Sequence, residues 1–209
     1  MMKRVSNAVI RRLPRYRRYL GELRARGVEK ISSSDLGEII GYTASQIRQD
    51  FNTFGGFGQQ GFGYSTDRLY EEISRIMGLD KKYRVVIIGI GNMGRAISNF
   101  LSSYDLGFEI VGMFDNSDKV IDTEIAGKKV SDFAKFNEFA ATEKIDIGVI
   151  CVNRESAQEV ANRLSASGAR GIWNFAPIDI DHDERVSVEN VHITDSLQVL
   201  SFLMSNNQE

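Results

Sequence analysis

Three glycines, Gly89, Gly91 and Gly94, stand in the spacing G-x-G-x-x-G. They follow an apolar run at residues 85–88, which is typical of a buried parallel strand, and they precede a helical pattern at 92–101. A strand, this glycine pattern and a helix in that order are typical of dinucleotide binding. We expect Gly89 to make the tight turn, Gly91 to let the backbone approach a pyrophosphate, and Gly94 to let the helix pack on its strand.

The turn and the start of the helix predict an anion site. Backbone N–H groups of Ile90, Asn92 and Met93 would join those of the glycines, and the helix N-terminus adds a positive dipole end. Asp115 ends the next apolar strand and lies 26 residues after Gly89, close to the place of an acidic ribose ligand. A carboxylate there accepts hydrogen bonds from the ribose hydroxyls and repels a 2′-phosphate. We therefore predict NADH and NAD⁺ as the ligands rather than their phosphorylated counterparts.

Two further strand ends predict the other half of the pocket. Val152 and Asn153 end one apolar strand, and Asn174, Phe175 and Ala176 end the next. Ligands of doubly wound sheets bind at the carboxyl ends of the strands. We therefore expect these residues to line a nicotinamide pocket, with ordinary strand-end packing as the alternative.

The chain offers little for catalysis or for a metal. A dehydrogenase usually needs a second domain and an acid–base pair near the nicotinamide. His182 and His192 lie in a polar segment without an evident partner, and we interpret them as surface or packing residues. The single cysteine, Cys151, sits in the run IGVICV, is expected to be a buried strand residue rather than a redox switch, and forms no metal-ligand cluster with the histidines. A coenzyme bound without catalysis would be a ligand that the protein senses.

The elements that must position these residues alternate along the chain. After the two strands and the helix described above, the pattern predicts a helix near 132–144, a strand at 146–152, a helix at 155–167 and a strand at 171–175. Strands that alternate with helices predict an α/β fold with a doubly wound parallel sheet of the Rossmann type.

The charge of the chain is divided unevenly. Residues 1–82 hold 15 Lys and Arg against 9 Asp and Glu, a net of +6, whereas the remainder holds 11 against 19, a net of −8. Residues 1–30 alone carry 10 basic and 2 acidic side chains. A basic front on an acidic body indicates a polyanion partner at one end, with a solvated helix face as the alternative.

The basic front has the pattern of a helix-turn-helix. Residues 14–26 predict a helix with Pro14 at its first position and Gly27 just past its end. A short helix capped by a serine among 32–34, with Ser34 the candidate, would bury Leu36, Ile39 and Ile40 before a turn at Gly41. A second helix opening at Thr43 or Ala44 would bury Ile47 and Phe51. Two short helices joined by a glycine turn match the motif, with a generic helical hairpin as the alternative.

The second helix of that motif would read DNA. Its N-terminal residues reach base edges in the major groove, where Arg reads guanine and Gln or Asn reads adenine. The polar side chains of this helix are Ser45, Gln46, Arg48, Gln49, Asp50 and Asn52. We predict DNA contacts from Thr43, Ser45, Gln46, Arg48 and Gln49.

A glycine-aromatic segment follows the reading helix. Residues 54–64 hold five glycines between aromatic side chains, which indicates an ordered wing or tight turn rather than a flexible linker. Gly58 and Gly61 would let the backbone approach phosphates closely. A packed connector between domains is the alternative.

The C-terminal stretch 196–204 is apolar nearly all round as a helix, so it should be buried on more than one side, as insertion into a partner subunit would achieve.

No run of eighteen apolar residues predicts a membrane span, and the N-terminus lacks the pattern of a secretory signal. We therefore expect a cytoplasmic protein with no membrane partner.

Taken together, these segments resemble the Rex family of redox-sensing transcriptional repressors. RLPRYRRYL, SSSDLGEIIGYTASQIRQDF, FGGFGQQGFGY, GIGNMG, FDNSD, GIWNFAP and VENV occur in the order of that family. The resemblance covers essentially the whole chain. It implies a homodimer with a winged helix-turn-helix over residues 1–80, a Rossmann domain over 81–190 and a swapped C-terminal helix over 191–209. It also implies that NADH releases the dimer from palindromic operator DNA, whereas NAD⁺ permits binding.

Carried over to this chain, the resemblance places the pyrophosphate on Gly89–Gly94, the adenosine ribose on Asp115 and the operator on Arg48 and its neighbours. Gln59 and Gln60 stand where family members often have two basic residues, and fewer phosphate contacts should flatten the salt dependence of DNA binding. Two other functions remain open. They are a small NAD-dependent oxidoreductase with a helical dimerisation head and a nucleotide-binding adaptor that touches no DNA.

Overall fold

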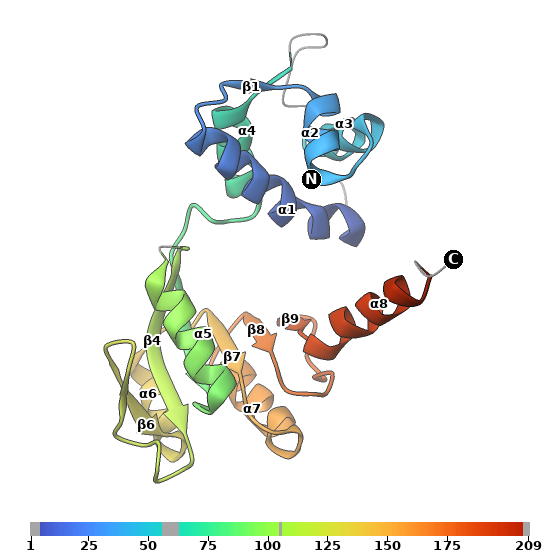
Figure 1. The fold of residues 1–209 in the computed structure, drawn as a ribbon. Helices are drawn as coiled ribbons and strands as arrows, with labels where there is room; N and C mark the ends of the chain where they lie inside the picture. Colours follow the sequence, from blue (N-terminus) through green and yellow to red (C-terminus); the bar gives the residue numbers. More distant parts are fainter. Residues whose placement is uncertain (1–4, 56–62, 105, 207–209) are drawn as a thin grey trace. The chain divides into compact units, whose positions relative to one another are not determined.

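The computed structural model describes residues 5–55, 63–104 and 106–206 (Figure 1). The chain forms two compact units, Met1–Lys81 and Lys82–Glu209. The first unit has one hydrophobic core, built around Tyr16, Leu36 and Phe51. The second has two core clusters, and they lie on opposite faces of a sheet.

The first unit is helical, with a small two-stranded sheet. Its elements are α1 (Asn7–Ala25), β1 (Lys30–Ile31), α2 (Ser33–Ile40), α3 (Ala44–Asn52), β2 (Tyr64–Ser65) and α4 (Thr66–Ile76). The strands β1 and β2 pair in antiparallel fashion, with Lys30 opposite Ser65. The predicted wing glycines Gly58 and Gly61, together with Gln59 and Gln60, lie outside the described residues.

Helix α1 begins well before Pro14, so the predicted start was wrong. Ser6 caps the helix by accepting a hydrogen bond from the N–H of Val9, and Pro14 lies inside it. A proline inside a helix leaves the carbonyl four residues earlier without its partner. Here that carbonyl belongs to Ile10, which is exposed and therefore open to water. The apolar stripe on which the prediction rested is otherwise correct, since Tyr16, Leu20 and Leu23 are buried.

Helix α2 differs from the prediction at its cap and on its inner face. Ser32 is the N-cap and accepts from the N–H of Asp35, whereas Ser34 is already helical. Leu36 and Ile40 are buried, but Ile39 is 44 % exposed and does not belong to the core of the first unit, because it lies at the edge of the buried face of the helix.

The turn and α3 complete the helix-turn-helix as predicted. Gly41 has a φ of +72°, the left-handed conformation that glycine adopts without strain. Thr43 caps α3 by accepting from the N–H of Gln46 at 3.1 Å. Ile47 and Phe51 are buried. The helix α3 therefore packs on the core of the first unit through one apolar side, and its other side faces outward.

The second unit is an α/β domain around a seven-stranded sheet. Its elements are β3 (Tyr83–Ile88), α5 (Asn92–Ser103), β4 (Phe108–Asp115), β5 (Glu124–Ile125), β6 (Lys128–Asp132), the 3₁₀ helix η1 (Phe133–Lys135), α6 (Phe136–Thr142), β7 (Ile147–Ile150), α7 (Arg154–Ala166), β8 (Gly171–Asn174), β9 (Ser187–Asn190) and α8 (Ile193–Asn206). The strand order is β5-β6-β4-β3-β7-β8-β9. Neighbours pair in parallel except for the short hairpin of β5 and β6.

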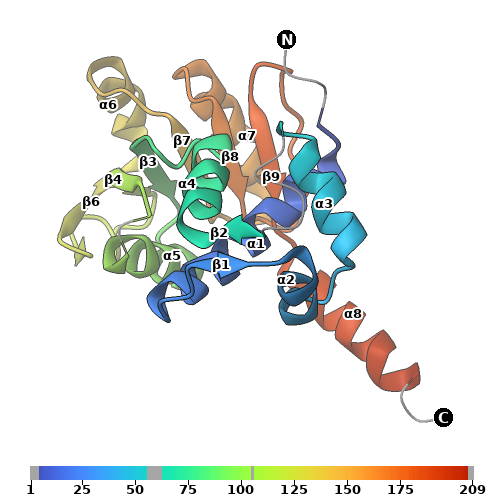
Figure 2. The same ribbon diagram turned by 90° about the horizontal axis from the view of Figure 1, so that it is seen from above.

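This arrangement confirms the Rossmann-type doubly wound sheet. Helix α5 covers one face, and α6 and α7 cover the other, as Figure 2 shows. In β3, Val85 and Ile87 pack in the cluster that contains Leu101 of α5, while Val86 and Ile88 pack in the cluster of α7. A strand buried on both faces reads as one continuous apolar run, which is why it was predictable. The strand order reverses at β3, and the crevice at the carboxyl ends there is where such sheets bind ligands.

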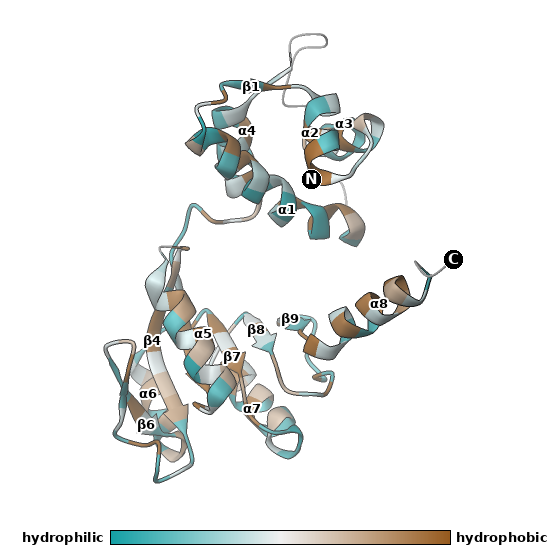
Figure 3. Ribbon diagram, viewed as in Figure 1, coloured by the Kyte–Doolittle hydropathy of each residue, from teal (hydrophilic) through white to brown (hydrophobic). Residues whose placement is uncertain are grey.

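Helix α8 presents its apolar residues to the outside. None of its residues, all of which are described, is buried. Its exposed apolar side chains, visible as brown bands in Figure 3, are Ile193, Leu197, Val199, Leu200, Phe202, Leu203 and Met204. A narrow polar stripe interrupts them at helical spacing, formed by Thr194, Gln198, Ser201 and Ser205. Among the described residues, no helix is long and apolar enough to cross a membrane.

Candidate functional site

The glycine turn between β3 and α5 is packed too tightly for side chains at two of its three glycines. A Cβ on Gly89 would lie 2.6 Å from the carbonyl oxygen of Cys151, and Gly89 has a φ of +91°. A Cβ on Gly94 would lie 2.0 Å from the carbonyl oxygen of Gly89. These two glycines therefore bring the strand end, the turn and the helix into backbone contact.

Gly91 has a different environment. A Cβ built on it meets no atom of the described chain within 4 Å. Gly91 is the N-cap of α5, and no described side chain bonds to the first N–H groups of that helix. Open space over uncapped N–H groups, at the positive end of a helix dipole, suits a phosphate group. The residues present therefore fit the pyrophosphate of a dinucleotide.

A pocket of about 310 Å³ opens at this edge of the sheet. Five of the predicted site residues line it together, namely Gly89, Gly91, Asp115, Val152 and Asn153. Asn153 also caps α7 by accepting from the N–H of Ser156 at 3.1 Å. A second cavity, of about 350 Å³ beside Tyr104 and Phe108, lies toward the amino ends of β3 and β4, away from the glycine turn.

Several pocket residues were missed. They are Ile88, Asn116, Phe133, Cys151, Ser156, Glu159 and Val160. Phe133 follows β6, a polar strand that the apolar pattern did not reveal, so its place at the strand ends could not be predicted. Burial raises the pKa of the Cys151 thiol to about 12, which keeps it protonated and argues against a redox switch.

Asp115 is tied to the glycine turn. Its Oδ2 accepts from the N–H of Ile90 at 2.6 Å, and its Oδ1 accepts from the N–H of Ser117 at 2.8 Å. An ionised carboxylate has about four acceptor positions, so both oxygens can accept further hydrogen bonds. The carboxylate thus faces the pocket from the end of β4 with room for ribose hydroxyls.

The predicted nicotinamide residues at the end of β8 pack beside the pocket rather than line it. Asn174 is fully buried, donates from Nδ2 to the carbonyl of Ile178 at 2.7 Å and to Oδ1 of Asn190 at 2.9 Å, and accepts from the N–H of Ala176. Phe175 is half-buried and meets Trp173 edge to face, with ring centroids 4.6 Å apart. Asn174 therefore holds the strand-end loops in place.

On the first unit, the outward side of α3 carries the predicted reading residues. Ser45, Arg48 and Gln49 are exposed. The Nη1 group of Arg48 donates to Oγ of Ser33, in the first turn of α2, at 2.9 Å. This contact spans the two helices of the motif and leaves a guanidinium at the surface.

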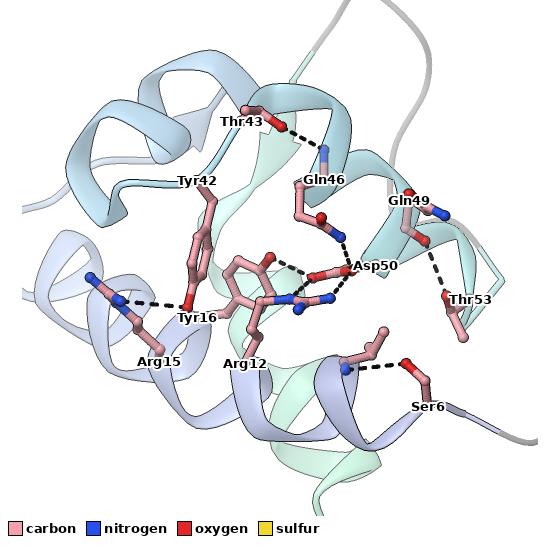
Figure 4. A network of polar contacts seen from close by, with 11 residues as sticks. Ser6, Arg12, Arg15, Tyr16, Tyr42, Thr43, Gln46, Gln49, Asp50 and Thr53 are labelled. Carbon is pink, nitrogen blue, oxygen red and sulfur yellow. Dashed lines mark hydrogen bonds and ion pairs between the residues drawn. The ribbon is translucent and has the colours of Figure 1, made fainter. Parts of the chain in front are cut away.

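Asp50 does not belong to this outward side, although its polarity suggested that it would. It is 1 % exposed, and its carboxylate is the centre of the polar network in Figure 4. Arg12 donates to it from Nε at 2.6 Å and from Nη2 at 2.7 Å, Tyr16 from its hydroxyl at 2.7 Å, and Gln46 from Nε2 at 2.9 Å. Burial by itself raises the pKa of Asp50, but the hydrogen bonds from Arg12, Tyr16 and Gln46 outweigh it and lower the pKa below its ordinary value.

Neither histidine lines the pocket of the second unit. His192 has its Nε2 at 3.1 Å from Oδ1 of Asp179, and His182 contacts the carbonyl of Asp183. Within the described part of the chain, no group of three or more His, Cys, Asp or Glu could hold a metal ion.

Comparisons with known proteins match the two units of the chain to two different family models. Residues 4–52 match the family model described as a putative DNA-binding protein N-terminus, and residues 80–178 match the CoA binding domain. A protein of Clostridioides difficile strain 630 named redox-sensing transcriptional repressor Rex is 50 % identical over 97 % of this chain and 96 % of its own length.

Among the crystal structures that match nearly the whole chain are two complexes. One is RSP in complex with β-NAD⁺ and operator DNA, which is 48 % identical with a TM-score of 0.92, over 99 % of this chain and 95 % of that one. The other is RSP in complex with β-NADH, which is 45 % identical with a TM-score of 0.91, over 99 % and 97 % of the two chains.

Proposed function

This chain belongs to the Rex family of redox-sensing transcriptional repressors, and on that premise we propose that it binds palindromic operator DNA as a homodimer and leaves it when NADH binds. One observation carries the proposal. The same chain holds a helix-turn-helix and a glycine turn whose open space at Gly91 and facing carboxylate at Asp115 fit a dinucleotide. The protein is a regulator and not an enzyme, and the oxidoreductase alternative is not favoured.

The ligand follows from chemistry. NAD and coenzyme A share an adenosine diphosphate, so the match to a CoA binding domain is compatible with either. NAD has free hydroxyls on its adenosine ribose, and these can donate hydrogen bonds to Asp115. Coenzyme A carries a phosphate on that ribose instead. A relative has been crystallised with NAD⁺ and operator DNA, and also with NADH. We assign NADH and NAD⁺ as regulatory ligands of this chain.

The preference for the reduced form follows from charge. The nicotinamide ring is positive in NAD⁺ and neutral in NADH, and an apolar wall disfavours burial of the positive ring. Val152, which lines the pocket, is the apolar residue that we place there, with the half-buried Phe175 packed beside the pocket. A hundredfold preference requires only about 2.7 kcal/mol.

NADH drives release only if it binds the two states of the dimer unequally. We propose that it favours a closed state in which the two DNA-binding domains no longer match the two half-sites.

The remaining assignments are part of the same proposal. Residues 1–80 form the DNA-binding domain, 81–190 the NADH-binding domain and 191–209 the helix swapped between subunits. The unpartnered apolar surface of α8 supports the swap. The ligand contacts are assigned to Gly89–Gly94, Asp115, Val152 and Asn153, the DNA contacts to Thr43, Ser45, Gln46, Arg48 and Gln49. Because its target is operator DNA, we place the protein in the cytoplasm, with no metal.

Titration of NADH into a complex with a labelled palindromic duplex tests the function. The duplex should first be selected from a random pool at a stated salt concentration, since DNA affinity depends on salt. We expect NADH to release the DNA and NAD⁺ to release much less of it. Unchanged DNA affinity at saturating NADH would refute the switch.

Asp115→Ala is expected to lower NADH affinity about 10- to 100-fold, the effect of losing hydrogen bonds to a charged acceptor. The ratio of NADH to NADPH affinity should fall as well, because the repulsion of a 2′-phosphate is removed. Asp115→Asn is the matched control, since it keeps the size and one acceptor oxygen but not the charge. Calorimetry with both coenzymes measures the two affinities, and an unchanged ratio in both variants would contradict the assignment.

Arg48→Ala is expected to lower operator affinity by about 1–3 kcal/mol per half-site, the value of one good bidentate base contact. NADH affinity should not change, because Arg48 lies in the first unit. Arg75→Ala is the control, since it removes the same charge from an exposed position on α4 outside the motif. Fluorescence anisotropy measures DNA binding. An equal loss in the two variants would reduce the role of Arg48 to general electrostatic attraction.

A further inference from the structure

Asp50 is a buried carboxylate on the reading helix that the proposed function leaves without a role. It lies on the inner side of α3, one helical turn after Gln46, and accepts hydrogen bonds from three residues. Two of them, Arg12 and Tyr16, belong to α1, so α1 anchors the carboxylate from the side opposite the reading surface (Figure 4).

The network determines which way the Gln46 amide faces. An ionised carboxylate offers only acceptors, so the amide nitrogen of Gln46, and not its oxygen, must point at Asp50. The bidentate contact with Arg12 keeps Asp50 ionised. Among the residues that the structure describes, the Gln46 side chain has no other hydrogen-bond partner, so its oxygen and its second N–H remain available.

We propose that Asp50 is a positioning residue that orients the Gln46 amide to read an adenine in the major groove. This inference rests on the proposed function. The N–H that points away from the amide oxygen bonds to Asp50. The oxygen and the N–H beside it then form one donor and one acceptor on the same edge. Adenine presents the complementary pair, the N7 acceptor and the N6 amino donor.

The position of Gln46 in the helix suits this role. Its backbone N–H is the one that Thr43 caps, so it lies in the first turn of α3, where residues of a reading helix reach base edges. A free glutamine loses side-chain entropy when it binds a base. Here the network has already limited that freedom before DNA arrives, which is the advantage of preorganisation.

Base preference, not affinity, separates this role from a merely structural one. The test measures the full-length protein by fluorescence anisotropy on a duplex panel derived from the selected operator. In the panel, each half-site position is changed symmetrically to every base pair. Wild type is expected to prefer adenine about tenfold at one position, and Gln46→Met to lose that preference.

Asp50→Asn is the decisive variant. An asparagine can present either oxygen or nitrogen, so the Gln46 amide is free to turn over. We expect the adenine preference to fall below about threefold, while the preferences at other positions remain. Tyr16→Phe is the matched control, because it removes a different hydrogen bond to the same carboxylate. It should lower the stability of the first unit and keep the adenine preference.

Two results would overturn the proposal. One is an adenine preference that survives Asp50→Asn unchanged, and the other is a loss of affinity by one common factor on every duplex. If Asp50→Asn does not fold, the side-chain amide of Gln46 in the wild-type protein decides by NMR, with Gln46→Met for assignment. One amide proton signal shifted by the carboxylate, away from the value of a solvent-exposed glutamine, supports the proposal, and two signals at the solvent-exposed values overturn it. A wild type that binds no duplex at all would remove the proposed function together with this inference.

Discussion

Gly94→Ala is expected to abolish NADH binding and to lower the free energy of unfolding of the second unit by at least about 2 kcal/mol. Alanine favours a helix over glycine by about 1 kcal/mol, but this gain is smaller than the cost of the clash. The new Cβ would lie 2.0 Å from the carbonyl oxygen of Gly89, a backbone atom that cannot swing aside. Helix α5 must therefore move off the strand end and take its N–H groups away from the pyrophosphate position.

The single tryptophan of the chain gives the measurement. Trp173 lies in β8, so its fluorescence during denaturation reports on the second unit alone. Gly91→Ala is the matched control, because Gly91 has a φ of −74° and open space around its Cβ position. We expect it to leave stability within about 0.5 kcal/mol and to lower NADH affinity at least about tenfold, since its methyl group fills the phosphate position. If Gly91→Ala bound NADH as tightly as wild type, the pyrophosphate would not lie over Gly91.

The elements buried on both faces of the sheet were predictable from their residues, and the edge elements were not. β3, β4 and β7 are apolar runs because helices cover both sides of them. β6 and β9 have the sequences KKVSD and SVEN, each with a single apolar residue, because they lie toward the edges, where one side of a strand meets water. A pattern that detects burial cannot detect a strand that is held mainly by its backbone hydrogen bonds.

The site residues also divide into those that a sequence motif predicts and those that only the tertiary structure brings to the site. Gly89 and Gly91 belong to the turn itself, and Asp115 lies at the distance along the chain that the motif specifies, so the motif alone brought them together. Phe133 and Glu159 reach the pocket from η1, which follows β6, and from α7, and only the strand order places them there. Asp50 shows the opposite error. Its polarity indicated an exposed position, but Arg12, which compensates its burial, lies 38 residues away in the sequence. Local pattern has no access to such a partner.

Leu200→Asp is expected to convert the proposed dimer to a monomer and to lower operator affinity about 10²- to 10⁴-fold. Leu200 is one of the apolar side chains of α8 that no described part of its own chain buries. If α8 is swapped, an aspartate there would have to lose its hydration without a partner, which is costly. In a dimer, binding of the first head raises the effective concentration of the second at its half-site, and a monomer loses that advantage. The loss of affinity therefore follows from the loss of assembly, with the reading helix unchanged.

Gln198→Asp separates this effect from a general effect of charge. Gln198 lies on the polar stripe of the same helix, so the same charge enters two positions earlier in the helix without touching the apolar surface. Light scattering after size exclusion measures the mass of each variant, and anisotropy on the palindromic duplex measures its affinity. We expect Gln198→Asp to remain dimeric and to bind DNA like wild type. A dimer that persists in Leu200→Asp would show that α8 is not the contact between subunits. A monomer with full operator affinity would show that each head binds its half-site independently, so that NADH could not act through the spacing of the heads.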